Sequence, residues 1–211
     1  KGIKTPITVN GDPIIQIGTV FHVYGTDEIF RHILVIGPKD NMNDNEICDN
    51  IDNVSVQRCK SEQELLIEWK NLIKNQDPDF ITGYNIFGFD FKYIVDRSKQ
   101  YFKHNSKCNN WRCTKYCKYT EFMNFGKIDS TSYTSKEFYC KKCDLKNFNS
   151  ANSFSENNYI SMDGRIIFDI AREVEKGHNL ESYKLDNVAS HFMRGNLLSV
   201  NNKQITVSKL G

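Results

Sequence analysis

The chain has 211 residues, of which 39% are hydrophobic and 26% are charged, so it is long enough to bury one sizeable core. No apolar run approaches the roughly 20 residues of a membrane-spanning helix, and no secretory signal is visible. These features argue against a membrane or secreted protein, and we expect a soluble, intracellular one. Seven cysteines in such a chain argue against a disulfide framework and leave free thiols or metal ligands.

The net charge of +2 is unevenly distributed. Residues 1–100 carry 11 basic and 15 acidic groups, residues 101–160 carry 10 and 5, and residues 161–211 carry 7 and 6. The basic middle third would favour phosphate backbones, although a solvated lysine-rich surface has the same composition. The chain opens at Lys1 without an initiator Met. We expect a piece of a longer polypeptide, although a processed or trimmed protein would look the same.

Strands are predicted first along the chain. From Pro13, alternate residues are apolar and would share the inward face of a strand that Gly25 closes. These residues are Ile15, Ile17, Phe21 and Val23. A second strand, rich in β-branched residues, is expected over residues 29–36, and the two are expected to form a hairpin. A third, short strand is expected over residues 54–58.

A helix is predicted to begin at Ser61, because Glu64 three residues later completes a capping box. Apolar residues follow at helical spacing and should face the core. They are Leu65, Leu66, Trp69, Leu72 and Ile73. The Asp77-Pro78 pair should end this helix.

The stretch 79–90 carries the features of a site. It reads as a short apolar strand that presents Tyr84 and Asn85 at its carboxyl end and enters a helix near Asp90. A carboxylate at such a corner, flanked by aromatic rings and an amide, can hold a divalent metal while the rings stack on a flat substrate. The alternative is that Asp90 caps its helix and the rings belong to the core.

The second half is less regular. Residues 101–160 are rich in Asn and Lys without a sustained period, and they are predicted to form an elaborated loop with a possible hairpin. A strand is expected over residues 165–168, followed by a helix that Asp169 caps and then a helix that Ser182 caps. The apolar stripe of the last helix is predicted to be Leu185, Val188, Ala189 and Phe192. This order of strands and helices fits an RNase H-like α/β core.

The segment Tyr84-Asn85-Ile86-Phe87-Gly88-Phe89-Asp90 resembles the second exonuclease motif of family B DNA polymerases, which is Tyr-Asn, three variable residues and Phe-Asp. Residues 12–18 and 163–192 resemble the same region of delta-type members and of large-DNA-virus enzymes. The resemblance implies that residues 1–211 are a partial 3′–5′ exonuclease domain with a Lys/Asn/Cys-rich insertion at about 101–160. It also implies an RNase H-like (DnaQ-like) mixed sheet with flanking helices, incomplete in this chain.

By that resemblance, Asp90 is the catalytic metal ligand, Asn85 and Phe89 grip the single-stranded 3′ end of a primer, and Tyr84 helps to shape the site. Two Mg²⁺ ions about 4 Å apart would supply the chemistry of phosphodiester hydrolysis. The implied partners are DNA and the remaining polymerase domains. The implied location is the nucleus or a viral replication compartment.

Two other carboxylate motifs of the family have no match here. The first, Asp-x-Glu, lies on a central strand before the segment matched by residues 12–18, and residues 1–11 contain no acidic pair. The third, Tyr-xxx-Asp, lies after the segment matched by residues 183–192. Tyr183 and Asp186 are one residue too close for it, so Asp186 is predicted to lie on a helix face. Without the central strand, both neighbouring strands should expose edges and apolar faces, and this segment alone should be inactive.

A cysteine cluster, from Cys108 to Cys143, falls within 36 residues. Its zinc candidates are Cys113, Cys117, Cys140 and Cys143, whose two- and three-residue spacers suit a zinc knuckle. The fifth cysteine is left over, and the resembled family gives no zinc precedent here. Cys48 and Cys59 are expected to be ordinary thiols.

Two other functions therefore stay open beside the exonuclease. The chain could be a catalytically inactive RNase H-like scaffold, or it could be a zinc-stabilised module that binds nucleic acid.

Overall fold

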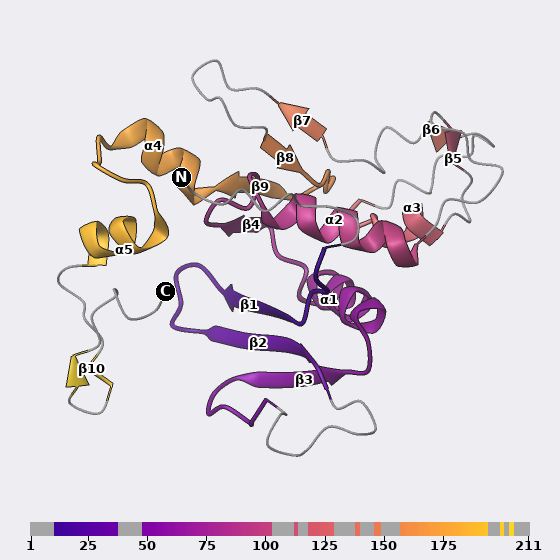
Figure 1. Cartoon of the computed structure of the whole chain (residues 1–211), viewed down its shortest axis with the longest axis horizontal. Coiled ribbons are helices and arrows are strands. Elements are labelled where there is room, and N and C mark those ends of the chain that lie inside the picture. Colours follow the sequence, from indigo (N-terminus) through magenta and orange to yellow (C-terminus); the bar gives the residue numbers. More distant parts are fainter. Residues whose placement is uncertain are drawn as a thin grey trace.

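The computed structural model describes residues 11–37, 48–102, 112–113, 118–128, 138–139, 146–148, 157–193, 199–200 and 203–204. Its first sheet begins with the predicted hairpin, in which β1 (Gln16–His22) and β2 (Ile29–Ile36) pair antiparallel. β3 (Ser55–Cys59) joins β2 in parallel and completes the order β1-β2-β3 (Figure 1). Ile17 and Phe21 of β1 contact the core, as their alternation with more exposed residues predicts.

The first helix, α1 (Glu62–Gln76), is the one that the capping box predicts. The Ser61 hydroxyl accepts a hydrogen bond from the Glu64 amide at 3.2 Å. Four of the five predicted core residues are buried, and Leu72 is half-buried. The helix ends at Asp77, whose φ of 46° turns the chain away before Pro78. α1 packs on the first sheet and against α2 (Asp90–Tyr101) (Figure 1).

A second sheet, with two strands, leads into the strand-to-helix corner predicted from the sequence. β4 (Phe80–Gly83) and β9 (Ile166–Asp169) run parallel, with Gly83 opposite Asp169 at their carboxyl ends. α2 follows β4 after a six-residue turn, and α4 (Ile170–Gly177) follows β9 directly. The ends of both strands therefore meet at one edge, where side chains from sequence-distant segments come together.

Part of the segment predicted as an elaborated loop belongs to the core. Phe122, Met123 and Phe125, in and after α3 (Lys118–Phe122), are buried against Trp69 and Phe102. Buried aromatic rings stabilise through contact area, which needs no periodic pattern. The described strands there pair antiparallel, as a hairpin would: β5 (Arg112–Cys113) with β6 (Phe138–Tyr139), and β7 (Lys146–Phe148) with β8 (Asn157–Tyr159).

The last helix differs from its prediction. α5 (Leu185–Met193) begins three residues after Ser182, and only Val188 of the predicted stripe is buried. Leu185 and Phe192 are exposed, so the buried face of the helix is narrower than the predicted apolar stripe. The short strands β10 (Ser199–Val200) and β11 (Lys203–Gln204) form a further antiparallel pair. Over the described residues, no helix is long and apolar enough to cross a membrane.

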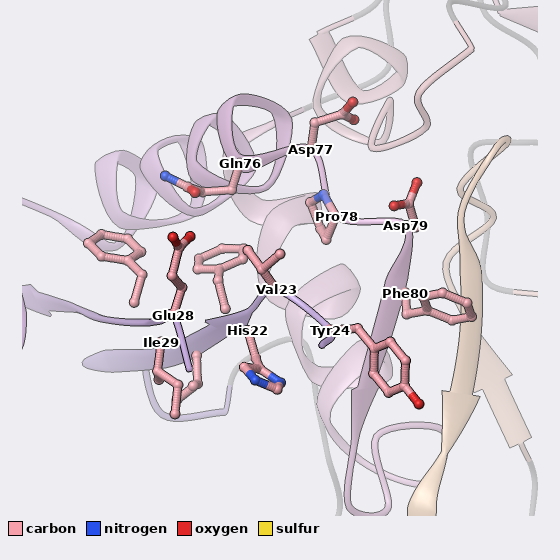
Figure 2. A pocket seen from close by; sticks show the side chains of 13 residues that line it. His22, Val23, Tyr24, Glu28, Ile29, Gln76, Asp77, Pro78, Asp79 and Phe80 are labelled. Carbon is pink, nitrogen blue, oxygen red and sulfur yellow. The ribbon is translucent and has the colours of Figure 1, made fainter. Parts of the chain in front are cut away.

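A pocket of about 660 Å³ separates the two sheets, between the carboxyl end of β1 and the amino end of β4 (Figure 2). Within the described residues β1 pairs only with β2, and β4 only with β9, so each has one unpaired edge. Apolar residues here are exposed, including Val20, Phe80 and Val23. The inward face predicted for β1 is therefore too long: Ile15 and Val23 lie beyond its ends and are 65% and 54% exposed.

Candidate active site

The predicted strand-to-helix corner is a tight turn, residues 84–89, which we call the corner turn. Asn85 has a φ of 58°, a conformation that Asn adopts more readily than most residues. Its carbonyl oxygen accepts hydrogen bonds from the amides of Gly88 at 3.0 Å and Phe89 at 3.1 Å. The Ile86 carbonyl accepts from Phe91 at 3.1 Å, so the turn passes directly into the first turn of α2.

Two glycines make this turn possible. A Cβ on Gly88 would lie 2.3 Å from Asn85 Oδ1, and a Cβ on Gly83 would lie 2.5 Å from Ile86 Cγ2. The close approach that these positions allow is therefore to side chains of the turn itself. Gly88 in particular fixes where the Asn85 amide can lie.

Asp90 is the first residue of α2 and is exposed. Phe89 occupies the N-cap position and the helix has no side-chain cap bond, so helix capping does not account for the Asp90 carboxylate. The surrounding protein raises the pKa of Asp90 by desolvation, and the Asp169 charge raises it further, although a bond to its own amide opposes both. An exposed carboxylate whose ionised form is disfavoured is well placed to gain a cation.

The aromatic residues of the corner fall into two groups. Phe87 is buried and packs against Phe91 and Tyr159. Phe89 is 48% exposed and stacks on Tyr93, with ring centroids 5.4 Å apart and an interplanar angle of 18°. Core packing therefore accounts for Phe87 and not for Phe89. The Phe89 ring, beside Asp90 in sequence, offers a face on which a base could stack.

The Tyr84 side chain contacts a segment much later in the chain. Its hydroxyl donates a hydrogen bond to the backbone carbonyl of Tyr183, 99 residues later. The Tyr183 hydroxyl in turn donates to the His178 carbonyl at 2.8 Å. Tyr84 thus links the corner turn to the connection between α4 and α5.

A second acidic residue reaches the corner, and its contacts there were missed from the sequence. Asp169 was predicted only as the cap of α4, and it does accept a hydrogen bond from the Ala171 amide at 3.0 Å. The same carboxylate also accepts from the amides of Asn85 at 2.7 Å and Phe87 at 2.9 Å. No sequence pattern links these partners, because they are 84 and 82 residues away.

Asp90 is the exposed carboxylate that the corner turn leads into. Asp90 offers oxygen ligands of the kind that Mg²⁺ prefers, whereas both Asp169 oxygens are engaged by backbone amides. In the part of the chain with described side chains, no three His, Cys, Asp or Glu residues gather to hold a metal ion.

The zinc candidates lie outside that part of the chain. Cys117, Cys140 and Cys143 are not among the described residues, and only the backbone of Cys113 is described, in β5. Zinc thus has no support from the described structure. Cys48 is half-buried and Cys59 is buried, as expected for ordinary thiols, and Asp186 lies in the first turn of α5, as predicted.

The pocket of Figure 2 is separate from the corner. Asp79 and Phe80, at the start of β4, line it, whereas the corner turn follows the end of β4. Asp90 is not among its lining residues. The pocket thus lies between the two sheets and not at the corner turn.

Comparison with known proteins identifies relatives over most of the chain. Residues 2–188 match the sequence model of the family described as DNA polymerase family B, exonuclease domain. The chain is 34% identical over 196 residues to a DNA polymerase of Pyramimonas orientalis virus, covering 92% of this chain and 14% of that protein. It is 31% identical over 185 residues to the DNA polymerase delta catalytic subunit of Dictyostelium discoideum, with coverages of 87% and 14%. For the same subunit of Glycine max, the identity is 28% over 190 residues, with coverages of 86% and 14%. The chain thus spans only 14% of the length of these curated relatives.

Proposed function

Because this chain belongs to the exonuclease domain of DNA polymerase family B, we propose that it is the proofreading 3′–5′ exonuclease segment of a larger DNA polymerase. The family match confirms the resemblance to delta-type and viral enzymes that the motifs indicated. The strands and helices of this chain are consistent with the predicted RNase H-like fold. The match favours the exonuclease over an inactive scaffold or a zinc-stabilised module.

The observation that carries this proposal is the exposed Asp90 carboxylate at the end of the corner turn, with Asn85 and Phe89 exposed in the same turn. The Phe89 ring would stack on a base of the frayed primer end, an interaction worth about 1–3 kcal/mol that tolerates any base. The Asn85 amide would hydrogen-bond the same strand. Such a site suits proofreading, because a mispaired end of any sequence must be bound.

Exonuclease domains of this family generally depend on divalent metal ions. We propose Mg²⁺ as the ion and Asp90 as one of its ligands. Bound there, a metal pair would activate water and stabilise the leaving alkoxide. The raised pKa of Asp90 fits this role, because a nearby cation offsets the desolvation and the Asp169 charge that disfavour its ionised form.

The remaining acidic ligands would come from elsewhere in the longer polypeptide. The unpaired edges of β1 and β4 and the pocket between them fit a strand inserted between the two sheets. In the resembled family the first acidic motif lies on such a central strand. The larger enzyme would act on DNA, with its other polymerase domains, in the nucleus or a viral replication compartment.

The test is Asp90→Ala in the longer polymerase, assayed on a 3′-labelled single-stranded oligonucleotide with Mg²⁺. Exonuclease activity should fall at least about a hundredfold, because the variant removes a metal ligand, while nucleotide addition stays unchanged. Asp52→Ala, which removes an exposed acid from the turn before β3, is the matched control and should leave both activities intact.

Two results would contradict the proposal. Exonuclease activity that survives Asp90→Ala would remove Asp90 from the site. A wild-type protein without exonuclease activity would favour the scaffold, and zinc binding together with DNA affinity in such a protein would favour the zinc module.

A further inference from the structure

The side chain that holds the corner turn is Asp169, at the end of the neighbouring strand. Asp169 is 1% exposed, and its carboxylate accepts three backbone hydrogen bonds. Oδ1 accepts from Asn85 at 2.7 Å and from Ala171 at 3.0 Å, and Oδ2 accepts from Phe87 at 2.9 Å. A carboxylate used in this way satisfies amides that would otherwise be left without partners in the interior.

The bonds continue from Asp169 to the backbone on either side of Asp90. The two amides that Asp169 holds belong to Asn85 and Phe87, on either side of Ile86. The Asn85 carbonyl then accepts from Gly88 and Phe89, and the Ile86 carbonyl accepts from Phe91. These bonds enclose the backbone of Asp90 at the start of α2. The Asp169 carboxylate thus holds the backbone that leads to Asn85 and Asp90.

The left-handed backbone of Asn85 makes this support necessary. A φ of 58° at a residue other than glycine costs free energy, and it persists where the surroundings impose it. The backbone N–H of Asn85 donates a hydrogen bond to Asp169. The backbone carbonyl of Asn85 accepts hydrogen bonds from Gly88 and Phe89. Without the Asp169 bond, the turn would be free to relax toward other conformations.

We propose that Asp169 is a positioning residue for the exonuclease reaction: its buried carboxylate fixes the corner turn, and thereby Asn85 and Asp90, without contacting metal or substrate. This inference rests on the proposed function. It assigns to Asp169 a role beyond capping α4, because a cap needs only the bond to Ala171.

Two variants distinguish the role of Asp169 as the cap of α4 from its role in holding the corner turn. Asp169→Asn keeps one oxygen, which can serve Asn85 and Ala171, but it places an NH₂ group against the Phe87 amide. Asp169→Ser keeps a good N-cap for α4 but is too short to reach the turn. Val174→Ala removes buried aliphatic volume from the same helix and is the control for general destabilisation.

The variants are made in the longer polymerase. We expect the exonuclease kcat to fall about tenfold for Asp169→Asn and further for Asp169→Ser, with KM for the oligonucleotide changing less and nucleotide addition unchanged. The Mg²⁺ concentration for half-maximal exonuclease activity should rise in the same order. Hydrogen exchange of a peptide spanning residues 84–89 should be about tenfold faster in Asp169→Asn and unchanged in Val174→Ala.

The outcomes distinguish this inference from the proposed function. If Asp90→Ala abolishes the exonuclease but Asp169→Asn stays within about twofold of wild type, or matches Val174→Ala in kcat and Mg²⁺ dependence, the positioning role is wrong. If Asp90→Ala leaves the exonuclease intact, the proposed function is wrong. If Asp169→Ser does not fold, Asp169→Asn and the exchange measurement still decide.

Discussion

Replacing Glu62 by Gln should loosen the helix that carries Asp90. Glu62 is the first residue of α1 and is 4% exposed, and Arg97 of α2 is 6% exposed. The Glu62 carboxylate accepts from Arg97 Nε at 2.7 Å, from the Tyr101 hydroxyl at 2.6 Å and from the Ile14 amide at 2.8 Å. Arg97 also donates to the Gly11 carbonyl at 2.6 Å. One carboxylate therefore joins α1, α2 and the segment before β1.

The magnitude follows from removing the negative charge that accepts hydrogen bonds from the buried Arg97 guanidinium. Removing one partner of a buried ion pair costs about 3–5 kcal/mol, and we expect about 3 kcal/mol because the Gln oxygen still accepts one bond. Replacing both residues, as in Glu62→Leu with Arg97→Met, should restore part of the stability, because both buried charges are removed together while the Ile14, Tyr101 and Gly11 groups still lose their partners.

Hydrogen exchange measures this loss of local stability without unfolding the whole protein. Buried amides near Leu66 and Val95 should exchange about a hundredfold faster in Glu62→Gln, since each 1.4 kcal/mol corresponds to about tenfold. The double variant should stay within about tenfold of wild type. Exchange within about twofold of wild type in Glu62→Gln would refute this account of how α2 is held.

The same carboxylate makes stability depend on pH. Burial alone would raise the pKa of Glu62, but hydrogen bonds from Arg97, Tyr101 and Ile14 outweigh it and hold the pKa below its ordinary value. The stabilisation is therefore present above the pKa of the unfolded state and is lost as pH falls through the lower, folded pKa. The exchange difference between wild type and Glu62→Gln should shrink in that acidic range.

Two further predictions concern Gly88 and Cys59. Gly88→Ala should displace the Asn85 side chain, because the new Cβ would lie 2.3 Å from Asn85 Oδ1. It should weaken binding of a single-stranded oligonucleotide by about fivefold, whereas Gly177→Ala, with no atom within 4 Å of its new Cβ, should bind normally; equal binding by both variants would contradict the turn geometry. Burial raises the pKa of the Cys59 thiol to about 11, and the charges of Glu64 and Glu68 add to this. Cys59 should therefore resist iodoacetamide at pH 8 while half-buried Cys48 reacts, and stability should fall as pH rises from 9 toward 11; mass spectrometry that finds Cys59 alkylated as fast as Cys48 would contradict this.

Local patterns predicted the parts of the fold that local interactions determine. The hairpin of β1 and β2, the Ser61 cap of α1 and the Asp169 cap of α4 all depend on residues close in sequence. The corner at Asp90 was also predictable, because a short apolar strand followed by an amphipathic helix leaves few other arrangements.

Contacts between distant segments explain what the sequence did not reveal. Lys70, Lys74 and Arg165 donate to backbone carbonyls within residues 121–126 and so hold a segment without periodicity against the core. The bonds from the corner turn to Asp169 likewise join residues more than 80 positions apart. On α5, more apolar residues lie at helical spacing than the core buries. Periodicity alone therefore does not predict which of them are buried.

The most direct test of the central claim is anomalous diffraction from Mn²⁺ bound to crystals of the longer polymerase with a single-stranded oligonucleotide in the exonuclease site. We predict a peak about 2 Å from an Asp90 carboxylate oxygen, with the 3′ end beside Phe89 and Asn85. An Asp90 carboxylate that faces away from both metal and DNA would contradict the account.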